Sequence, residues 1–198
     1  MEIGYFPKKY YNNTPNAGGF FPFLLDNQTK YVINFETDLK YTNEEWLFHW
    51  MNKMKLFPLY FCLEVPNSWT YELNLKHNEI INSVETSDSI VYKFKIATLE
   101  QFLDHFSFCI ELACNGENVL WSNRDVFSLE SMTWFGNIKG QLKEAIVVDL
   151  QEKNSVLFWI NYDADSFVLI TNDELYSNYN FIIDNLPESF TPEFAEYV

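Results

Sequence analysis

The chain has 198 residues, of which 47% are hydrophobic and 19% aromatic, so it can bury a large core and does not have the composition of a disordered protein. Its 28 acidic and 13 basic residues give a net charge of −15. This charge argues against direct binding to nucleic acid or to an anionic membrane, since both depend on clustered lysine and arginine, and it favours a basic protein as partner.

The first 30 residues alternate turn formers with aromatic residues and predict an irregular arm packed on the body of the protein. The opening residues lack an apolar h-region, so we expect no signal peptide. Three cysteines, an odd number without framework spacing, favour a reduced cytoplasmic protein. Because no low-complexity linker separates two cores, residues 1–198 are expected to form a single domain.

Residues 31–97 predict strands around one helix. Residues 31–35 and the apolar run 59–65 have the character of strands. Between them, Thr42 and Glu45 have capping-box spacing, apolar residues follow at helical spacing, and Phe57-Pro58 ends the pattern. Residues 69–76 and 90–97 alternate apolar with polar side chains, which is typical of antiparallel strands with one buried face. The polar stretch 77–89 between them is predicted to be a loop.

A second helix follows from the next stretch of sequence. Thr98 and Gln101 form another capping box, and Asn115-Gly116 supplies a C-terminal stop. Between these signals a single apolar stripe contains Leu99, Phe102, Leu103, Phe106, Ile110 and Ala113. Residues 117–140 show no clear periodicity.

The C-terminal quarter predicts a three-stranded meander, 145–150, 155–162 and 166–171, with short connections. Val156 to Ile160 are all apolar, so this strand is expected to be central and buried on both faces. Thr171 and Glu174 suggest a third capping box, followed by a short helix over about 172–185 and a final turn or arm. The whole pattern predicts an α+β fold, with a largely antiparallel sheet and two or three helices packed on it.

Negative charge is concentrated in the same quarter. From Glu144 onward there are eleven acidic residues and one basic residue, Lys153. Because the apolar strands can carry charge only at their ends and turns, we expect these carboxylates to gather at the rim of the sheet, in one exposed region that attracts a cationic macromolecule. The predicted partner-binding residues are Asp163, Asp165, Asp173, Glu174, Asp184, Glu188, Tyr162, Tyr176 and Tyr179. The alternative interpretation is a surface charge that serves solubility alone.

No motif for catalysis or metal binding is complete. Asp163-Ala164-Asp165 begins like a calcium loop, but Phe167 occupies the position of the third ligand. His105 and Cys109 are four residues apart on the predicted second helix and lack further ligands at suitable spacing. We therefore predict no catalytic residue, no metal and no cofactor.

Small size, strong acidity, abundant aromatic residues and the lack of a leader or a catalytic motif resemble the cytosolic immunity proteins that bacteria pair with secreted toxins. The resemblance implies a one-to-one complex that blocks a cognate toxin such as a nuclease, with no enzymatic activity. Three alternatives remain open: a nucleic-acid mimic that inhibits a DNA-binding enzyme, a small enzyme or ligand-binding domain with a site assembled from distant residues, and an acidic structural subunit.

Overall fold

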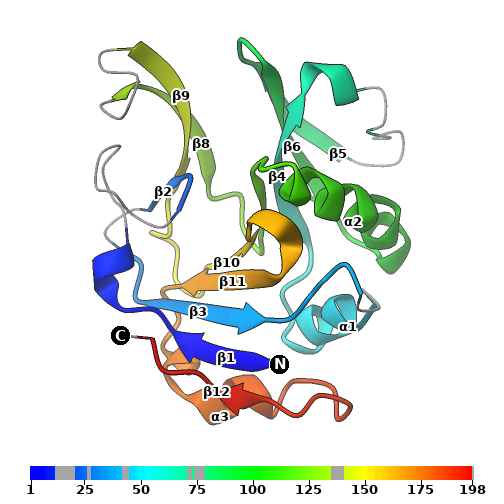
Figure 1. Ribbon diagram of the computed structural model, residues 1–198, viewed down its shortest axis with the longest axis vertical. Helices are drawn as coiled ribbons and strands as arrows, with labels where there is room; N and C mark the ends of the chain where they lie inside the picture. The colour runs from blue at the N-terminus through cyan, green and yellow to red at the C-terminus, as the bar shows by residue number, and fades with distance from the viewer. Residues whose placement is uncertain are drawn as a thin grey trace.

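The computed structural model describes residues 1–11, 21–25, 28–41, 45–70, 73, 79–134 and 141–197, which form an α+β fold (Figure 1). The large sheet has the strand order β12-β1-β3-β11-β10-β7-β4-β6-β5. Its strands are β1 (Glu2–Tyr5), β3 (Tyr31–Glu36), β4 (Leu59–Pro66), β5 (Glu79–Glu85), β6 (Ser89–Ile96), β7 (Val119–Ser122), β10 (Val156–Ile160), β11 (Ser166–Thr171) and β12 (Glu193–Phe194).

A smaller sheet and the helices complete the described part of the chain. The small sheet contains β2 (Leu24–Leu25), β9 (Gln141–Val148) and β8 (Phe127–Trp134), in that order. The helices are α1 (Glu45–Lys53), α2 (Leu99–Cys114) and α3 (Tyr179–Ile183), with short 3₁₀ helices η1 (Lys8–Tyr10), η2 (Asn67–Trp69), η3 (Tyr162–Ala164) and η4 (Glu174–Ser177). Among the described residues, no helix is long and apolar enough to cross a membrane.

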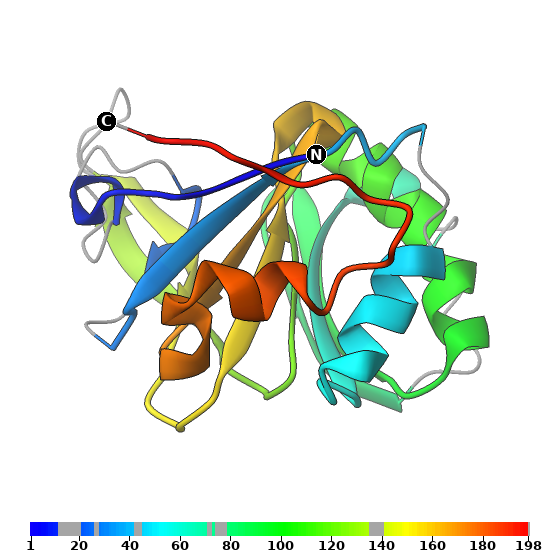
Figure 2. The same cartoon turned by 90° about the horizontal axis from the view of Figure 1, so that it is seen from below.

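The large sheet lies between two apolar layers, with α1 and α2 on one side and β8 and β9 on the other (Figure 2). Alternate residues along each strand enter different layers: in β11, Phe167 and Leu169 face the helices, whereas Val168 and Ile170 face the small sheet. Strand β10 lies between β11 and β7 and is buried at every position, which confirms the predicted central strand.

A row of aromatic rings crosses the helix-covered face of the sheet. It joins six adjacent strands through Phe94, Phe61, Trp121, Phe158, Phe167 and Phe35. Successive ring centroids lie 4.6 to 6.2 Å apart, and the rings of Trp121 and Phe158 are nearly parallel at 9°. Such ring pairs add about 0.5–1.5 kcal/mol each beyond the burial of their area. We call this set the aromatic row and expect it to contribute to the cohesion of the sheet.

Several predicted elements are confirmed. The strand beginning at Tyr31, the helix α1, the buried strand β4, the strand β6 and the hairpin of β10 and β11 all occur where the patterns place them. Helix α2 begins at the predicted capping box, with the Thr98 hydroxyl accepting from the amide of Gln101 and the Gln101 side chain accepting from the amide of Thr98. Residues 42–44 of the first capping box lie outside the described residues.

Three predictions about these segments are wrong, and one stretch for which no structure was predicted also forms strands. Residues 2–5 of the expected arm form β1, because β3 and the C-terminal β12 pair on both of its sides. Residues 79–85 form the edge strand β5 where a loop was expected, and its mostly exposed side chains explain why no apolar period marks it. Residues 119–122 and 127–134 are strands within the unclear stretch. Strand β9 pairs with β8 in the small sheet and takes no part in a meander with β10.

Further corrections concern the sheet and the last helix. The large sheet is mixed, since β1 and β12 run parallel, so a largely antiparallel sheet is not what the structure has. Trp69 belongs to η2, and most of the predicted strand 69–76 lies outside the described residues. The expected helix over 172–185 is broken at Asn178, whose extended backbone separates η4 from α3. Asp173, not Thr171, caps η4 through the amide of Leu175.

The aromatic row predicts a large cost for removing its most connected ring. Trp121 stacks on the rings of two neighbouring strands, and its indole N–H points at the sulfur of Met51, 3.2 Å away. We expect Trp121→Ala to lower the free energy of unfolding by about 3–5 kcal/mol in urea titration, because it opens a cavity in a packed core. Tyr41→Ala, at a side chain that is 86% exposed, is the control and should change stability by less than about 0.5 kcal/mol. A loss below about 1 kcal/mol for Trp121→Ala would show that the row does not hold the sheet together.

Candidate functional site

Acidic residues meet at the end of the large sheet where β3 finishes and β1 and β12 begin (Figure 1). The register places Glu193 of β12 opposite Glu2 of β1, Glu2 opposite Glu36 of β3, and Glu36 opposite Ser166 of β11, directly after Asp165. Neighbouring strands lie about 4.8 Å apart, so Glu193, Glu2 and Glu36 form a row on three strands, and Asp165 lies directly before the strand next to Glu36. We call Glu2, Glu36, Asp165 and Glu193 the acidic sheet end.

The acidic sheet end has no basic counterpart in the part of the chain that the structure describes. The ion pairs there join Lys30 to Glu174, Lys93 to Asp125, Lys95 to Glu79 and Arg124 to Glu152. None of them includes Glu2, Glu36, Asp165 or Glu193. Like charges on directly opposite strand positions destabilise a sheet, so this arrangement carries a cost that the fold itself does not require.

An open recess of about 470 Å³ adjoins the acidic sheet end, on the face that points away from the helices. Its walls are Phe6, Asn34, Glu36, Asn161, Asp165, Ser166 and Tyr197. These residues come from β1's C-terminal flank, β3, the turn between β10 and β11, and the C-terminal segment. The recess therefore exists only because strands distant in sequence pair side by side.

The turn between β10 and β11 orients Asp165. Asp163 and Ala164 adopt positive φ values of 72° and 53°, which lets the chain reverse within three residues. The Asn161 amide oxygen accepts from the backbone N–H of Tyr162, and its Nδ2 donates to the Ser166 hydroxyl at 3.1 Å. Ser166 Oγ in turn donates to Asp165 Oδ1 at 3.1 Å. This relay leaves the second carboxylate oxygen, Oδ2 of Asp165, free of hydrogen bonds within the described residues.

The other wall is closed by the C-terminal segment. The Tyr197 hydroxyl donates to Glu36 Oε1 at 2.8 Å and accepts from Asn34 Nδ2 at 2.7 Å. Its ring meets the ring of Phe6 edge-on at 4.6 Å. Burial, followed by the nearby charge of Glu36 and Glu2, raises the pKa of Tyr197 to about 12, so it stays protonated and acts as a donor to Glu36 at neutral pH.

Gly4 makes this wall possible. A Cβ on Gly4 would lie 2.2 Å from the carbonyl oxygen of Ala195 and 2.6 Å from the ring of Tyr197. Only a residue without a side chain lets the C-terminal segment cross β1 at this distance.

The predicted partner-binding residues do not come together as expected. Asp163 and Asp165 lie at one end of β11, whereas Asp173 and Glu174 follow its other end, about 20 Å away at 3.3 Å per residue. Asp184 and Glu188 are exposed after α3. The prediction of one continuous region is therefore wrong, because the length of strand β11 separates Asp163 and Asp165 from Asp173 and Glu174.

The predicted partner-binding residues also differ in whether they are exposed and in whether they already pair within the protein. Lys30 Nζ lies 2.5 Å from Glu174, and Tyr31 donates a hydrogen bond to the same carboxylate, which lowers the pKa of Glu174. Tyr176 is 2% exposed and belongs to the helix-side core, so its ring is not at the surface. Tyr179 is half-buried against Phe194, whereas Tyr162 is 39% exposed beside the turn that carries Asp163.

Sequence reasoning missed Glu2, Glu36, Asn34 and Tyr197. These residues are separated by as many as 195 positions along the chain. No local motif links them. The local signal was limited to Glu36, which directly follows the predicted strand 31–35.

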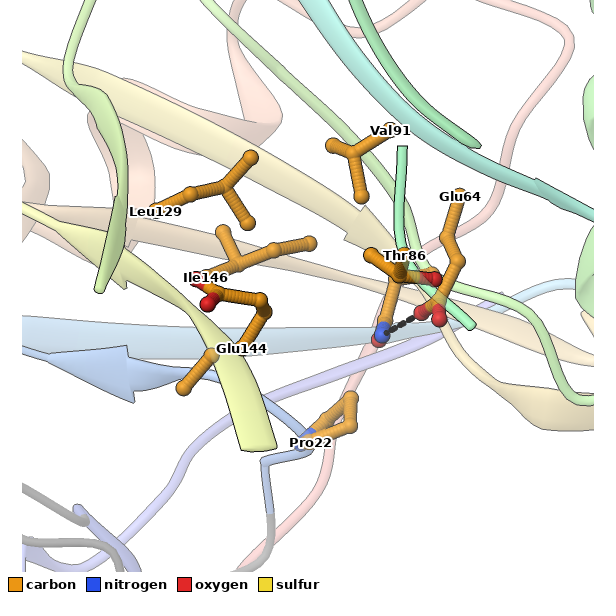
Figure 3. A pocket seen from close by; sticks show the side chains of 9 residues that line it. Pro22, Glu64, Thr86, Val91, Leu129, Glu144 and Ile146 are labelled. Carbon is orange, nitrogen blue, oxygen red and sulfur yellow. Dashed lines mark hydrogen bonds between the residues drawn. The ribbon is translucent and has the colours of Figure 1, made fainter. Parts of the chain in front are cut away.

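A second, much smaller cavity of about 40 Å³ lies where β4 and β6 of the large sheet face β8 and β9 (Figure 3). The Glu64 carboxylate there accepts from Asn118 Nδ2 at 2.6 Å and from the Ser89 hydroxyl at 3.0 Å. Glu144 lines the same cavity from β9. This volume suits water and is well below the roughly 300–1,000 Å³ of typical ligand pockets, so we do not regard it as the main site.

The side chains best known for nucleophilic or metal chemistry lie elsewhere. His105 is 4% exposed and packs against the ring of Phe94, and burial lowers its pKa. Cys62 and Cys109 are buried, which raises both thiol pKa values, that of Cys62 to about 12. Among the described residues there is no group of three or more His, Cys, Asp and Glu that could hold a metal ion.

Thiol accessibility provides a direct test of these positions. Cys114 is exposed at the end of α2, whereas the other two thiols are buried and held protonated. We expect an aromatic disulfide reagent at pH 8 to modify Cys114 rapidly and Cys62 and Cys109 only after denaturation, because the thiolate is the reactive form. Cys114→Ser should abolish the rapid reaction. Rapid modification of Cys62 or Cys109 in the folded protein would contradict the packing described here.

The close crossing at Gly4 yields a second test. Gly4→Ala should push the C-terminal segment off β1, because the new methyl group overlaps the Ala195 carbonyl. Hydrogen exchange should then accelerate at the amides of Glu193 and Ala195, which donate to Met1 and Ile3. The amide of Phe102 in α2, which donates to Thr98, serves as the internal reference and should keep its protection. Unchanged exchange at Ala195 would show that the segment does not depend on Gly4.

Comparison with protein-family models, with curated proteins and with solved structures finds no match for this chain.

Proposed function

We propose that this protein is a non-catalytic acidic binding protein that neutralises a basic protein partner. In its most concrete form, it is an immunity protein that blocks a cognate toxin such as a nuclease. The observation that carries this proposal is the row of Glu193, Glu2 and Glu36 on three adjacent strands, with Asp165 directly before the fourth, and without an ion pair to any described basic residue.

The physical argument is electrostatic complementarity. A nuclease presents lysine and arginine to hold phosphate, and a rigid row of carboxylates can occupy those groups and block substrate entry. With a net charge of −15, the protein also attracts such a partner over long range and speeds the encounter. The cost of placing like charges side by side is offset when a cationic surface covers them.

The proposed interface is narrower than the set of acids predicted from sequence. It is centred on the acidic sheet end and includes the exposed Asp163 and Tyr162 of the adjoining turn. Asp173, Glu174, Asp184 and Glu188 lie outside it and serve as references for the effect of net charge. We further propose that the protein acts in the cytoplasm, with no direct contact to nucleic acid or membrane.

A ligand-binding domain is the second candidate. The recess of about 470 Å³ falls within the range of small-molecule sites, and several polar groups converge on it. Neither a histidine nor Arg124 lines it, and Arg124 pairs with Glu152.

Charge variants at the two locations test the proposal. The site variant combines Glu2→Gln, Glu36→Gln and Asp165→Asn, and the control removes the same charge through Asp173→Asn, Asp184→Asn and Glu188→Gln. The partner is captured from cells of the source organism, identified by mass spectrometry, purified and measured by surface plasmon resonance. We expect the site variant to weaken binding by at least about tenfold and the control by less than about threefold.

Salt dependence completes the test. Raising NaCl from about 0.05 to 0.5 M should slow association with the wild-type protein, because the added ions screen the attraction. Equal losses of binding affinity in the two triple variants would show that the interface lies outside the acidic sheet end. Turnover of a small molecule by the purified protein, or binding to a partner without basic surface, would overturn the proposed function itself.

A further inference from the structure

Residues 193–197, which we call the C-terminal strap, run beside β1 and then cross it (Figure 2). The amides of Glu193 and Ala195 donate to the carbonyl oxygens of Met1 and Ile3 at 3.0 and 2.9 Å. Both residues of β12 are exposed, so the core buries little of this part of the chain. The hold of the strap on β1 therefore depends on a small number of local contacts.

Tyr197 anchors the end of the strap. Its ring lies over Gly4, only 2.6 Å from the position that a Cβ would occupy there. Its hydroxyl donates to Glu36 Oε1 at 2.8 Å and accepts from Asn34 Nδ2 at 2.7 Å. A hydrogen bond to an ionised carboxylate is stronger than one between neutral groups. The carboxylate of Glu36 therefore helps to hold the strap in place.

The beginning of the strap carries a charge that opposes this hold. Glu193 is paired with Glu2, and Glu2 with Glu36, on three adjacent strands, and all three side chains are exposed. Side chains at directly opposite positions stand on the same face of the sheet, where like charges are destabilising. The ion pairs among the described residues include none of the three carboxylates. The strap is thus attracted at one end and repelled at the other.

We infer that the C-terminal strap is an electrostatic switch: repulsion between Glu193 and Glu2 loosens it, and neutralising these carboxylates closes it on β1. The hydrogen bonds of Tyr197, Glu193 and Ala195 act at short range and hold the strap whatever ions surround it. The repulsion between exposed carboxylates is weakened by ions and by nearby cations. The balance between the two therefore follows the charge of whatever lies on the acidic sheet end.

This inference deepens the proposed function and rests on it in one respect, because the basic partner supplies the neutralising charge. A cationic surface over Glu2 and Glu193 removes their repulsion and tightens the strap. By thermodynamic linkage, a tightened strap favours the bound partner by the same factor. Closing also keeps Tyr197 against Glu36, so the wall beside the recess becomes firmer when the partner is bound.

Hydrogen exchange at the amide of Ala195 tests the switch without any partner. Glu2→Gln keeps the size of the side chain and removes the charge opposite Glu193. At fixed pH and low salt, we expect this amide to exchange about two- to fivefold more slowly than in the wild type, because a like-charge pair is removed. Residue 2 is remote from Ala195 in sequence, so the variant does not change the intrinsic exchange rate of that amide.

A second variant should change the same exchange rate in the opposite direction. Tyr197→Phe keeps the ring over Gly4 and removes the hydroxyl that donates to Glu36, so Ala195 should exchange about two- to tenfold faster. The control Glu188→Gln removes an equal charge from an exposed side chain outside β12 and should leave the rate unchanged. The amide of Phe102 in α2 is the internal reference in every variant.

Three results would overturn the switch. One is unchanged or faster exchange at Ala195 in Glu2→Gln. Another is an equal slowing in Glu188→Gln, because the effect would then follow net charge and not the pairing with Glu193. The third is an equal change at Phe102, which would assign the effect to the stability of the whole protein.

A hexa-arginine peptide tests the link to a cationic partner. We expect it to slow exchange at Ala195 more than NaCl of equal ionic strength does, and to have a smaller effect in Glu2→Gln. Slower exchange in Glu2→Gln and with the peptide, in a protein that captures no basic partner, would support the switch and reject the proposed function. Capture of a basic protein through the acidic sheet end, with exchange at Ala195 unchanged by Glu2→Gln and by the peptide, would reject the switch and leave the proposed function standing.

Discussion

The aromatic row is the constraint on which the rest of the structure depends. Its rings lie on one face of six consecutive strands, so a shift of one residue in any strand would move a ring from the helix-side layer to the opposite layer. The row therefore fixes register as well as stability. Once Phe35 and Phe167 are stacked at 4.6 Å, Glu36 and Ser166 have to lie opposite each other at the strand ends. The position of the acidic sheet end is a consequence of core packing.

Sequence patterns were sufficient to predict a helix or strand where the burial of its side chains is periodic or continuous. The fully apolar strand from Val156 to Ile160 and the capped helix from Leu99 to Cys114 were both predictable, because each satisfies a local rule without help from distant residues. Strand β5 was not predictable, since its mostly exposed residues carry no apolar period. Strands β1 and β12 stabilise each other across almost the whole chain, and a single sequence contains no signal for such a pairing.

The candidate site was less predictable than the fold. Asp165 could be proposed from charge alone, but its neighbours Glu36 and Tyr197 depend on strand order and on the crossing at Gly4. Acids that are close in sequence, such as Asp165 and Asp173, lie at opposite ends of one strand. Charge density along a chain therefore indicates that a protein is acidic, whereas the register of its sheet decides which carboxylates meet.

The rigidity of this surface bears on how it can bind. Carboxylates on flexible loops lose conformational freedom when a partner orders them, which weakens association. Glu2 and Glu36 stand on paired strands, and Asp165 is held by the Ser166 hydroxyl at the beginning of β11. Their backbone positions are thus fixed before a partner arrives, and the repulsion between them is already part of the folded state. A cationic partner gains from relieving that repulsion and orders side chains without also ordering the backbone, which is why carboxylates on paired strands suit binding to a basic surface better than a disordered acidic tail would.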